Sequence, residues 1–444
     1  AARWSGAVVG LVAVLVICAG VCNGAETSPK LDIDGVPFVK LSSIKMDNLK
    51  YLDQLVALNV SHVRVYLNWN YIQSVLPTPV QNLTVDELRT NTTWIVPYSE
   101  ELDWSTPDYY VQTLLGVGIR PLIEVGEGTT HCLPTIGSSS GPPASPDNLG
   151  NSNYLAYMYR YARAAVHRYK DYVGIWQIEN ELNEAYLEAV SGIRSPSTIG
   201  RWRNIWADWD WVTELLQTLN WAVHDEDSSL QTTTNLHTDI PEHVHQLLRL
   251  PGYYEQAAAE WAPYMDVVSF DAYPNYVVAT PSYANELGDR TANILAAVNY
   301  TMPCMVMEAG YPTANDTAAQ PNKVNYTQSR QGDYFTDSIG AVVDANGSGF
   351  GVFTCYGCGG FSPPPGGYTD EDIDALEVTN RAMQSGRLLP AILWLLEPGE
   401  EHIEYMFTRF PEVVAVVADG WCILNADGSP KEGYLAIQQW YNKL

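Results

Sequence analysis

Short apolar segments rich in β-forming residues recur along this chain, and longer stretches with helical spacing of apolar residues separate them. Turn-forming or polar residues bound each short segment, as is typical of strands buried on both faces of a parallel sheet. The predicted strands are Phe38–Leu41, His62–Leu67, Arg120–Val125, Val173–Ile178, Leu230–Leu236, Met265–Phe270, Cys304–Met307 and Gly349–Thr354. The predicted helices include Tyr154–Tyr169, Trp206–His224, Thr291–Tyr300 and Gln331–Asp344.

Eight strand–helix units in series predict an α/β fold, a (β/α)8 TIM barrel with loop insertions. The active site of such a barrel lies at the carboxyl ends of its strands. Polar residues follow the predicted strands at these ends: Asn68, Glu124, Glu127, Glu181, His237, Tyr273 and Glu308. A doubly wound open sheet is the alternative. It would carry a glycine-rich phosphate loop after its first strand, and the sequence has none there.

Polar or proline-rich stretches interrupt this pattern, and we interpret them as insertions: Leu76–Ser105, Thr129–Asn153, Phe361–Tyr368 and Ser385–Val417. The last contains an apolar piece, Leu388–Leu396, which could cap the barrel or pack beneath it. Near the end, Trp421–Trp440 predicts a closing turn at Asn425–Gly428 and a last helix. Because no boundary suggests a second domain, we expect one domain over residues 26–444.

Composition limits the classes of partner. The chain has 444 residues, of which 46% are apolar, so a large core can be buried. Its 14 Trp and 28 Tyr can fill a core or lie against the faces of sugars. The formal net charge of −27 opposes binding to nucleic acid or anionic lipid.

The first 25 residues have the pattern of a signal peptide. Arg3 is positive, the apolar run Ala7–Val21 is short for a membrane span, and cleavage is expected near Gly24 and Ala25. An uncleaved anchor is the alternative. Acceptor sites for N-glycosylation occur at Asn59, Asn82, Asn91, Asn299, Asn315, Asn325 and Asn346. We therefore expect a glycoprotein, secreted or in the lumen of the secretory or lysosomal pathway, with no membrane association after cleavage.

The cysteines that follow the predicted signal peptide are Cys132, Cys304, Cys355, Cys358 and Cys422. Their odd number allows two disulfide bonds and one free thiol, and the sequence leaves the pairing open. Cys355 and Cys358 have the spacing of half a zinc site. No second pair accompanies them, so a disulfide or two plain thiols is favoured over a metal.

Two carboxyl groups stand out, because cleavage of a glycosidic bond needs one to protonate the leaving oxygen and another to attack the anomeric carbon or activate water. The apolar strand within Gly174–Asn183 runs directly into Asn180 and Glu181, and the strand within Pro303–Thr313 ends in Glu308. Burying a lone carboxylate at a strand end is costly, which favours a functional role. Two ordinary rim charges are the alternative, and Glu179 is the alternative acid.

Asn–Glu after the fourth strand and Glu after the seventh resemble the signature of glycoside hydrolase clan A, the retaining (β/α)8 glycosidases. The resemblance implies Glu181 as acid/base and Glu308 as nucleophile. It implies that Arg64 orients the nucleophile and that the hydroxyl of Tyr273 contacts it. The run Glu308-Ala-Gly-Tyr-Pro-Thr313 is similar to family 17 β-1,3-glucanases, and Asn180-Glu-Leu-Asn183 is similar to family 53 β-1,4-galactanases.

Two positions depart from the clan pattern. Asp271 stands where many members carry His two residues before the strand-six Tyr, and it could join the site or cap a turn. At the end of strand eight, Cys355 and Tyr356 stand where many members have Trp; Tyr356 or Trp421 could substitute for it.

Further residues complete the predicted substrate-binding set: Asn180, His237, Tyr311, Trp69, Glu127 and Tyr356. Each has a structural alternative. His237 could be a satisfied structural histidine, Glu127 a solvated rim charge, and any single aromatic ring, Trp104 included, a core residue.

These features predict a retaining hydrolase that cleaves a β-linked glycan by double displacement, with an endo-acting glucanase, mannanase or galactanase expected. The mechanism needs no metal and no organic cofactor, and a monomer is expected. The alternatives are a non-catalytic carbohydrate-binding barrel and a transglycosylase that uses the same two Glu residues.

Overall fold

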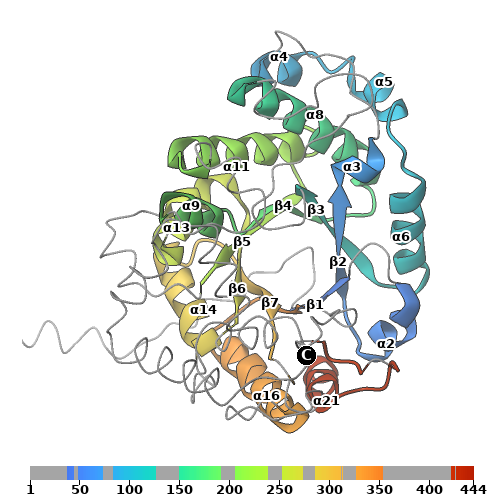
Figure 1. The fold of residues 1–444 in the computed structure, drawn as a ribbon, viewed down its shortest axis with the longest axis vertical. Coiled ribbons are helices and arrows are strands. Elements are labelled where there is room, and N and C mark those ends of the chain that lie inside the picture. The colour runs from blue at the N-terminus through green and yellow to red at the C-terminus, as the bar shows by residue number, and fades with distance from the viewer. Residues whose placement is uncertain are drawn as a thin grey trace, which may run out of the picture.

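A computed structural model describes residues 38–44, 49–73, 84–126, 150–191, 206–238, 253–273, 286–311, 313, 327–353, 422–425 and 427–444. Eight parallel strands pair in chain order, and β8 pairs with β1 to close a barrel (Figure 1). The strands are β1 (Val39–Ile44), β2 (His62–Asn68), β3 (Arg120–Gly126), β4 (Ile175–Asn180), β5 (Gln231–His237), β6 (Val267–Ala272), β7 (Cys304–Ala309) and β8 (Gly349–Val352). The predicted (β/α)8 TIM barrel is confirmed.

Helices surround the strands on the outside (Figure 1). They are α2 (Leu52–Ala57), α3 (Trp69–Ile72), α4 (Val85–Thr90), α5 (Ile95–Glu100), α6 (Ser105–Gly116), α8 (Asn151–Tyr169), α9 (Leu182–Ser191), α11 (Trp209–His224), α13 (Tyr254–Trp261), α14 (Glu286–Ala297), α16 (Gln328–Asp344) and α21 (Glu432–Tyr441), with short 3-10 helices η1 (Leu49–Tyr51) and η2 (Ala262–Tyr264). The last helix, α21, packs against α16. Its Tyr441 hydroxyl donates to the carbonyl of Phe350 on β8 (2.6 Å), which ties the chain end to the seam of the barrel.

Helix boundaries differ from the prediction where a capping side chain decides them. The stretch predicted from Trp206 begins as α11 at Trp209, because the Asp208 side chain accepts from the Trp211 N–H (3.2 Å). The insertion predicted over Leu76–Ser105 contains α4 and α5 and is therefore not all loop. A capping box between Thr84 and Glu87 begins α4.

The closure of the barrel depends on two glycines of β8. A Cβ on Gly351 would lie 2.0 Å from the carbonyl oxygen of Met307 on β7, and one on Gly349 would lie 2.8 Å from the Cβ of Val39 on β1. No other residue fits such close backbone approaches on both sides.

The barrel interior has two halves of different chemistry. Seven buried apolar residues form a cluster separate from the larger core between strands and helices: Val39, Leu41, Leu122, Ile175, Val267, Met305 and Met307. Closer to the carboxyl ends of the barrel strands, the buried side chains include Arg64, Glu124, Gln177, Asn235 and Asp271. The apolar half supports a polar half at the end where barrel enzymes bind their substrates.

Other predictions have mixed outcomes. The turn at Asn425–Gly428 is confirmed: the Gly428 N–H donates to the Asn425 carbonyl (2.9 Å), and Gly428 has a φ of 84°. Cys304 is a buried free thiol. Most of Thr129–Asn153 and all of Phe361–Tyr368 and Ser385–Val417 lie outside the described residues, as do Cys132, Cys355 and Cys358. No helix among the described residues is both long and apolar enough for a membrane span.

Candidate active site

Irregular strand pairing brings Glu308 into the barrel. Beside β7, Phe270 of β6 pairs with Val306, but the next residue, Asp271, pairs with Glu308, so Met307 is an extra residue. In a regular strand Glu308 would point away from the interior, because its neighbour Met307 belongs to the interior cluster. The bulge re-aims the Glu308 side chain toward the inside.

A similar irregularity precedes Glu181. Beside β4, Gln177 pairs with Thr233 of β5, and the next pair is Asn180 with Asn235, so β4 contains one extra residue. Both residues that flank Asn180 adopt positive φ, 67° at Glu179 and 48° at Glu181. Two such conformations in non-glycine residues are unfavourable, and clusters of them are typical of functional sites.

Glu308 is surrounded by hydrogen-bond donors. Its Oε1 forms a buried ion pair with Arg64 of β2, and its Oε2 accepts from the hydroxyl of Tyr273, directly after β6. The hydroxyl of Tyr66 lies 3.5 Å from Oε1 and also accepts from Arg64. Only 5% of Glu308 is exposed, so this carboxylate depends on Arg64 for its compensating charge.

Both tyrosine hydroxyls remain protonated donors. Burial, offset in part by the charge of Arg64, raises the pKa of Tyr66 to about 12. Burial and the negative charges of Asp271 and Glu181 raise the pKa of Tyr273 well above its ordinary value. The two hydroxyls can therefore hold the Glu308 oxygens without giving up their protons.

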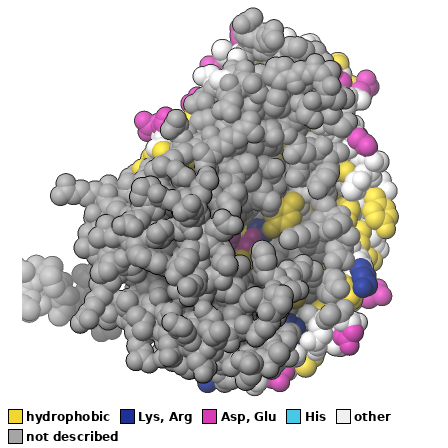
Figure 2. Space-filling view, in the orientation of Figure 1, with side chains coloured by type: hydrophobic (Ala, Val, Ile, Leu, Met, Phe, Trp, Pro, Cys, Tyr) yellow, Lys and Arg dark blue, Asp and Glu magenta, His cyan; other side chains and the backbone are white. Residues whose placement is uncertain are grey.

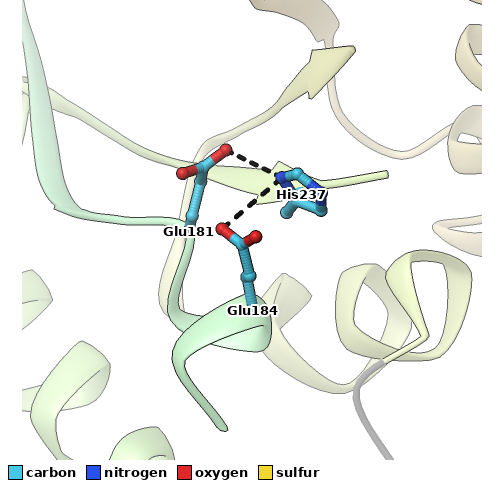
Figure 3. Close-up of side chains that lie close together, drawn as sticks. All are labelled: Glu181, Glu184 and His237. Carbon is cyan, nitrogen blue, oxygen red and sulfur yellow. Dashed lines mark hydrogen bonds and ion pairs between the residues drawn. The ribbon is translucent and has the colours of Figure 1, made fainter. Parts of the chain in front are cut away.

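Glu181 lies among different neighbours. Its Oε1 is 3.0 Å from Nδ1 of His237, and its Oε2 accepts from the side-chain amide of Asn180 (3.3 Å). His237 also lies 3.6 Å from Oε2 of Glu184 on α9, so the ring stands between two carboxylates (Figure 3). Asp271 completes the surroundings: it pairs with His237 across β5 and β6, and the Asn235 amide that donates to it also donates to Asn180.

A continuous hydrogen-bond network links the two carboxylates. Arg64 donates to Oε1 of Gln177 (3.3 Å), and Nε2 of Gln177 donates to Oδ1 of Asn235 (2.7 Å). Asn235 in turn donates to Oδ1 of Asn180 (2.6 Å) and to Oδ2 of Asp271. Because β2, β4, β5 and β6 each contribute a member, the network fixes the relative positions of groups on opposite sides of the barrel.

Glu179, the alternative acid, and Glu181 have different neighbours. The Glu179 carboxyl group packs so closely on Gly126 of β3 that a Cβ there would lie 2.8 Å from its Cδ. Glu181 instead lies with Asn180, His237 and Asp271.

Some predicted binding residues lie elsewhere. Trp69 is fully buried, stacks on Tyr161 at 5.2 Å and donates to Gln73 (2.8 Å), so its predicted contact with sugar is wrong. Tyr311 is a buried residue, 4% exposed and packed against Tyr334 at 5.4 Å, and its binding role stays a prediction. Trp104 is likewise buried, as its alternative expected.

Glu127, Tyr356 and Trp421 lie outside the described residues. At the end of β8, the described aromatic residue is Phe353, whose ring meets that of Tyr273 edge-to-face at 5.5 Å.

The sequence reasoning missed Tyr66, Gln177 and Asn235. A signal was available, because Tyr66 lies two residues after Arg64 and Asn235 two residues before His237. Alternation along a strand places such residues on the same face as their partner.

The ligand atoms of Glu181, Glu184 and His237 lie within 4.8 Å of one another, a spacing that a metal ion could also use (Figure 3). The hydrogen bond between His237 and Glu181 accounts for this approach without an ion.

Acidic, basic and hydrophobic side chains appear together at the bottom of a hollow near the middle of the face shown in Figure 2. A separate hollow of about 650 Å³ lies at the amino ends of the barrel strands. It is lined by residues that precede or begin β3, β4 and β5, such as Arg120, Gly174 and Gln231.

No family model and no curated protein matches the sequence. Among solved structures, the chain is similar to an exo-β-1,4-mannosidase from Opitutaceae bacterium strain TAV5, with a TM-score of 0.52 and 13% identity over 95% of this chain and 62% of that one. A GH2 β-galacturonidase from Eisenbergiella tayi has a TM-score of 0.48 and 11% identity over 92% and 51%. A β-glucuronidase from an uncultured Clostridium sp. has a TM-score of 0.47 and 14% identity over 93% of this chain and 51% of that one. The chain thus spans between half and two thirds of the length of these proteins. The likeness to the mannosidase shows the fold, and neither family 17 nor family 53 is confirmed.

Proposed function

We propose that this chain is a retaining glycoside hydrolase for β-linked glycans, with Glu181 as acid/base and Glu308 as nucleophile. The observation that carries the proposal is the contrast between the two carboxyl groups. Glu308 pairs with the Arg64 guanidinium, whereas Glu181 lies with the amide of Asn180, the ring of His237 and the carboxyl group of Asp271. A cation favours the ionised form that a nucleophile requires, and an anionic neighbour favours the protonated form that an acid requires.

The reaction follows from these roles as a double displacement. Glu308 attacks the anomeric carbon while Glu181 gives its proton to the glycosidic oxygen; the bond to the leaving sugar breaks and a glycosyl ester forms. Glu181 then takes a proton from water, whose oxygen attacks the anomeric carbon and releases Glu308. Arg64 and Tyr273 hold the Glu308 oxygens in place for the attack.

We further propose that the enzyme is an endo-acting glycanase whose substrate is a β-glucan, β-mannan or β-galactan. We expect it to be a secreted, monomeric protein. The fold is shared with an exo-β-1,4-mannosidase, whose name gives a β-linked substrate, and this agrees with the proposed class of bond. The chemistry requires no metal or organic cofactor.

The test is a screen of purified mature protein on β-1,3-glucan, β-1,4-mannan, β-1,4-glucan and β-1,4-galactan. On the accepted glycan, Glu181→Gln should lower kcat about 10²- to 10⁴-fold, the usual contribution of a general acid. On an aryl glycoside of the same sugar, whose leaving group departs without protonation, azide should restore turnover in this variant by attacking the glycosyl ester, and Glu308→Gln should remain inactive with azide. Glu179→Gln is the matched control, because the same substitution two residues away should give no azide rescue.

Wild-type rates in either Glu181→Gln or Glu308→Gln would overturn its assigned role. Glycan binding without turnover in the wild-type protein would favour the non-catalytic barrel. Transfer to added oligosaccharide acceptors in preference to water would favour a transglycosylase.

A further inference from the structure

We propose that Asp271 is a positioning residue that shares one proton with Glu181, so that the pair holds the proton Glu181 delivers to the leaving sugar. The inference rests on the proposed function. It concerns the position where Asp271 replaces the more usual His of the resembling glycosidases.

The hydrogen bonds of Asn235 determine where the proton on Asp271 can be. Gln177 donates to Oδ1 of Asn235, so the amide nitrogen of Asn235 points the other way and donates to Oδ2 of Asp271. Oδ2 is therefore an acceptor. Oδ1 of Asp271 is fully buried and receives no donor among the described residues. A proton on Asp271 must be on Oδ1. Asn235 also donates to Asn180 (2.6 Å), whose side-chain amide donates to Oε2 of Glu181 (3.3 Å), so these two amides hold the carboxyl groups of Asp271 and Glu181 beside each other.

Burial makes a doubly ionised pair unfavourable. Asp271 has 0% exposure and Glu181 has 7%, so water screens little of the repulsion between their charges. Burial, followed by the charge and hydrogen bond of Glu181, raises the pKa of Asp271 well above its ordinary range. Two carboxyl groups in such contact retain one proton between them, as in other close carboxyl pairs.

The groups that surround the pair leave this proton in place. Those that face it or its direct partners are Arg64 and Tyr66 on β2, Glu124 on β3, Glu184 on α9, His237 on β5, Tyr273 after β6 and Glu308 on β7. Among them Arg64 is the permanent cation, and it forms its ion pair with Glu308. One guanidinium cannot balance the carboxylates around it, so a bound proton lowers the net charge of the site.

The proposed reaction moves this proton without changing the net charge of the site. When Glu181 protonates the leaving oxygen, the Glu181–Asp271 pair becomes doubly negative while Glu308 loses its charge as an ester. When water attacks the ester, the pair regains one proton and Glu308 regains its charge. The carboxyl pair can thus ionise fully only at the step where the neighbouring negative charge has gone.

The test is Asp271→Asn, which keeps the shape of the side chain and cannot bind or release a proton. Glu181 then titrates alone, so the basic limb of the kcat/KM profile should move to lower pH by about one unit or more. The matched control is Asp266→Asn, the same substitution directly before the amino end of β6, where Asp266 accepts from His224 (2.9 Å). It should leave the basic limb in place.

A second readout does not depend on activity. The infrared carbonyl band of a protonated carboxylic acid should persist to higher pH in the wild-type protein than in Asp271→Asn or Glu181→Gln. If that band titrates at the same pH in all three, or if Asp271→Asn leaves the basic limb unmoved, no proton is shared. If the band behaves as expected but the protein cleaves no glycan, the proposed function fails and the carboxyl pair stands.

Discussion

Replacing Arg64 by methionine measures the dependence of the barrel on its buried ion pair. The Arg64 side chain has 0% exposure and that of Glu308 has 7%, so the substitution leaves a carboxylate inside the barrel without its cation. Removing one partner of a buried pair costs about 3–5 kcal/mol of unfolding free energy. The Tyr273 hydroxyl still donates to Glu308, which puts the expected loss at the lower end, about 3 kcal/mol.

The assay is urea unfolding followed by tryptophan fluorescence, at pH 8 and at pH 5. The loss should be smaller at pH 5, because protonation removes the uncompensated buried charge. The double variant Arg64→Met, Glu308→Gln removes both charges and should recover most of the stability lost by the single change. Arg89→Met is the control: its pair with Asp225 is partly exposed (29% and 22%) and should cost about 1 kcal/mol or less.

Two outcomes would refute this reasoning. One is a double variant no more stable than Arg64→Met, which would mean that Arg64 acts by packing and not by compensating the charge of Glu308. The other is an equal loss at pH 5 and pH 8, because a charge-dependent penalty must change with protonation.

Gly351→Ala should destabilise the barrel severely, by about 3 kcal/mol or more, because its Cβ would lie 2.0 Å from the Met307 carbonyl oxygen. The control, Gly116→Ala on α6, has open space around it and should be neutral or stabilising. Equal melting temperatures for the two variants would contradict this prediction. The pair of His224 and Asp266 should stabilise the fold most between about pH 4 and pH 6.5. The hydrogen bond that His224 donates to Asp266 raises the pKa of His224 above 6.5. The contribution of protonated His224 to the free energy of unfolding is therefore complete below pH 6.5 and is lost as pH rises through the folded pKa. Burial alone would raise the pKa of Asp266, but the hydrogen bonds from His224 and the Thr232 N–H lower it below 3.8. The contribution of ionised Asp266 to the free energy of unfolding is therefore lost only as the pH falls through that lowered pKa. His224→Gln should therefore reduce the unfolding free energy more at pH 5.5 than at pH 8.5, and an equal reduction at both would refute the assignment.

The order of strands and helices could be predicted from the sequence, because a strand buried on both faces leaves a local apolar pattern. All eight predicted strands correspond to observed ones, although β4 and β6 are shifted by two residues toward their carboxyl ends and β7 is two residues longer there. At β4 and β7 the difference matters, because the added residues include Asn180 and Glu308. Local patterns locate an element better than they locate its ends.

Aromatic residues mark the limit of that reasoning. The sequence cannot distinguish a tryptophan that binds sugar from one that fills the core, because both uses suit the same side chain. Trp69 follows directly after β2 at the active-site end, yet it packs outward against Tyr161 of α8.

The amino-acid sequence is enough to predict the barrel, the strand ends at which Glu181 and Glu308 occur, and the presence of an Asp where the resembling glycosidases often have His. The direction of each carboxyl group and its partners follow from the three-dimensional packing. The bulges in β4 and β7 and the contact between Asp271 and Glu181 depend on register between strands far apart in the chain. A local sequence pattern contains no information about that register, because it is set by how all eight strands pack around one interior.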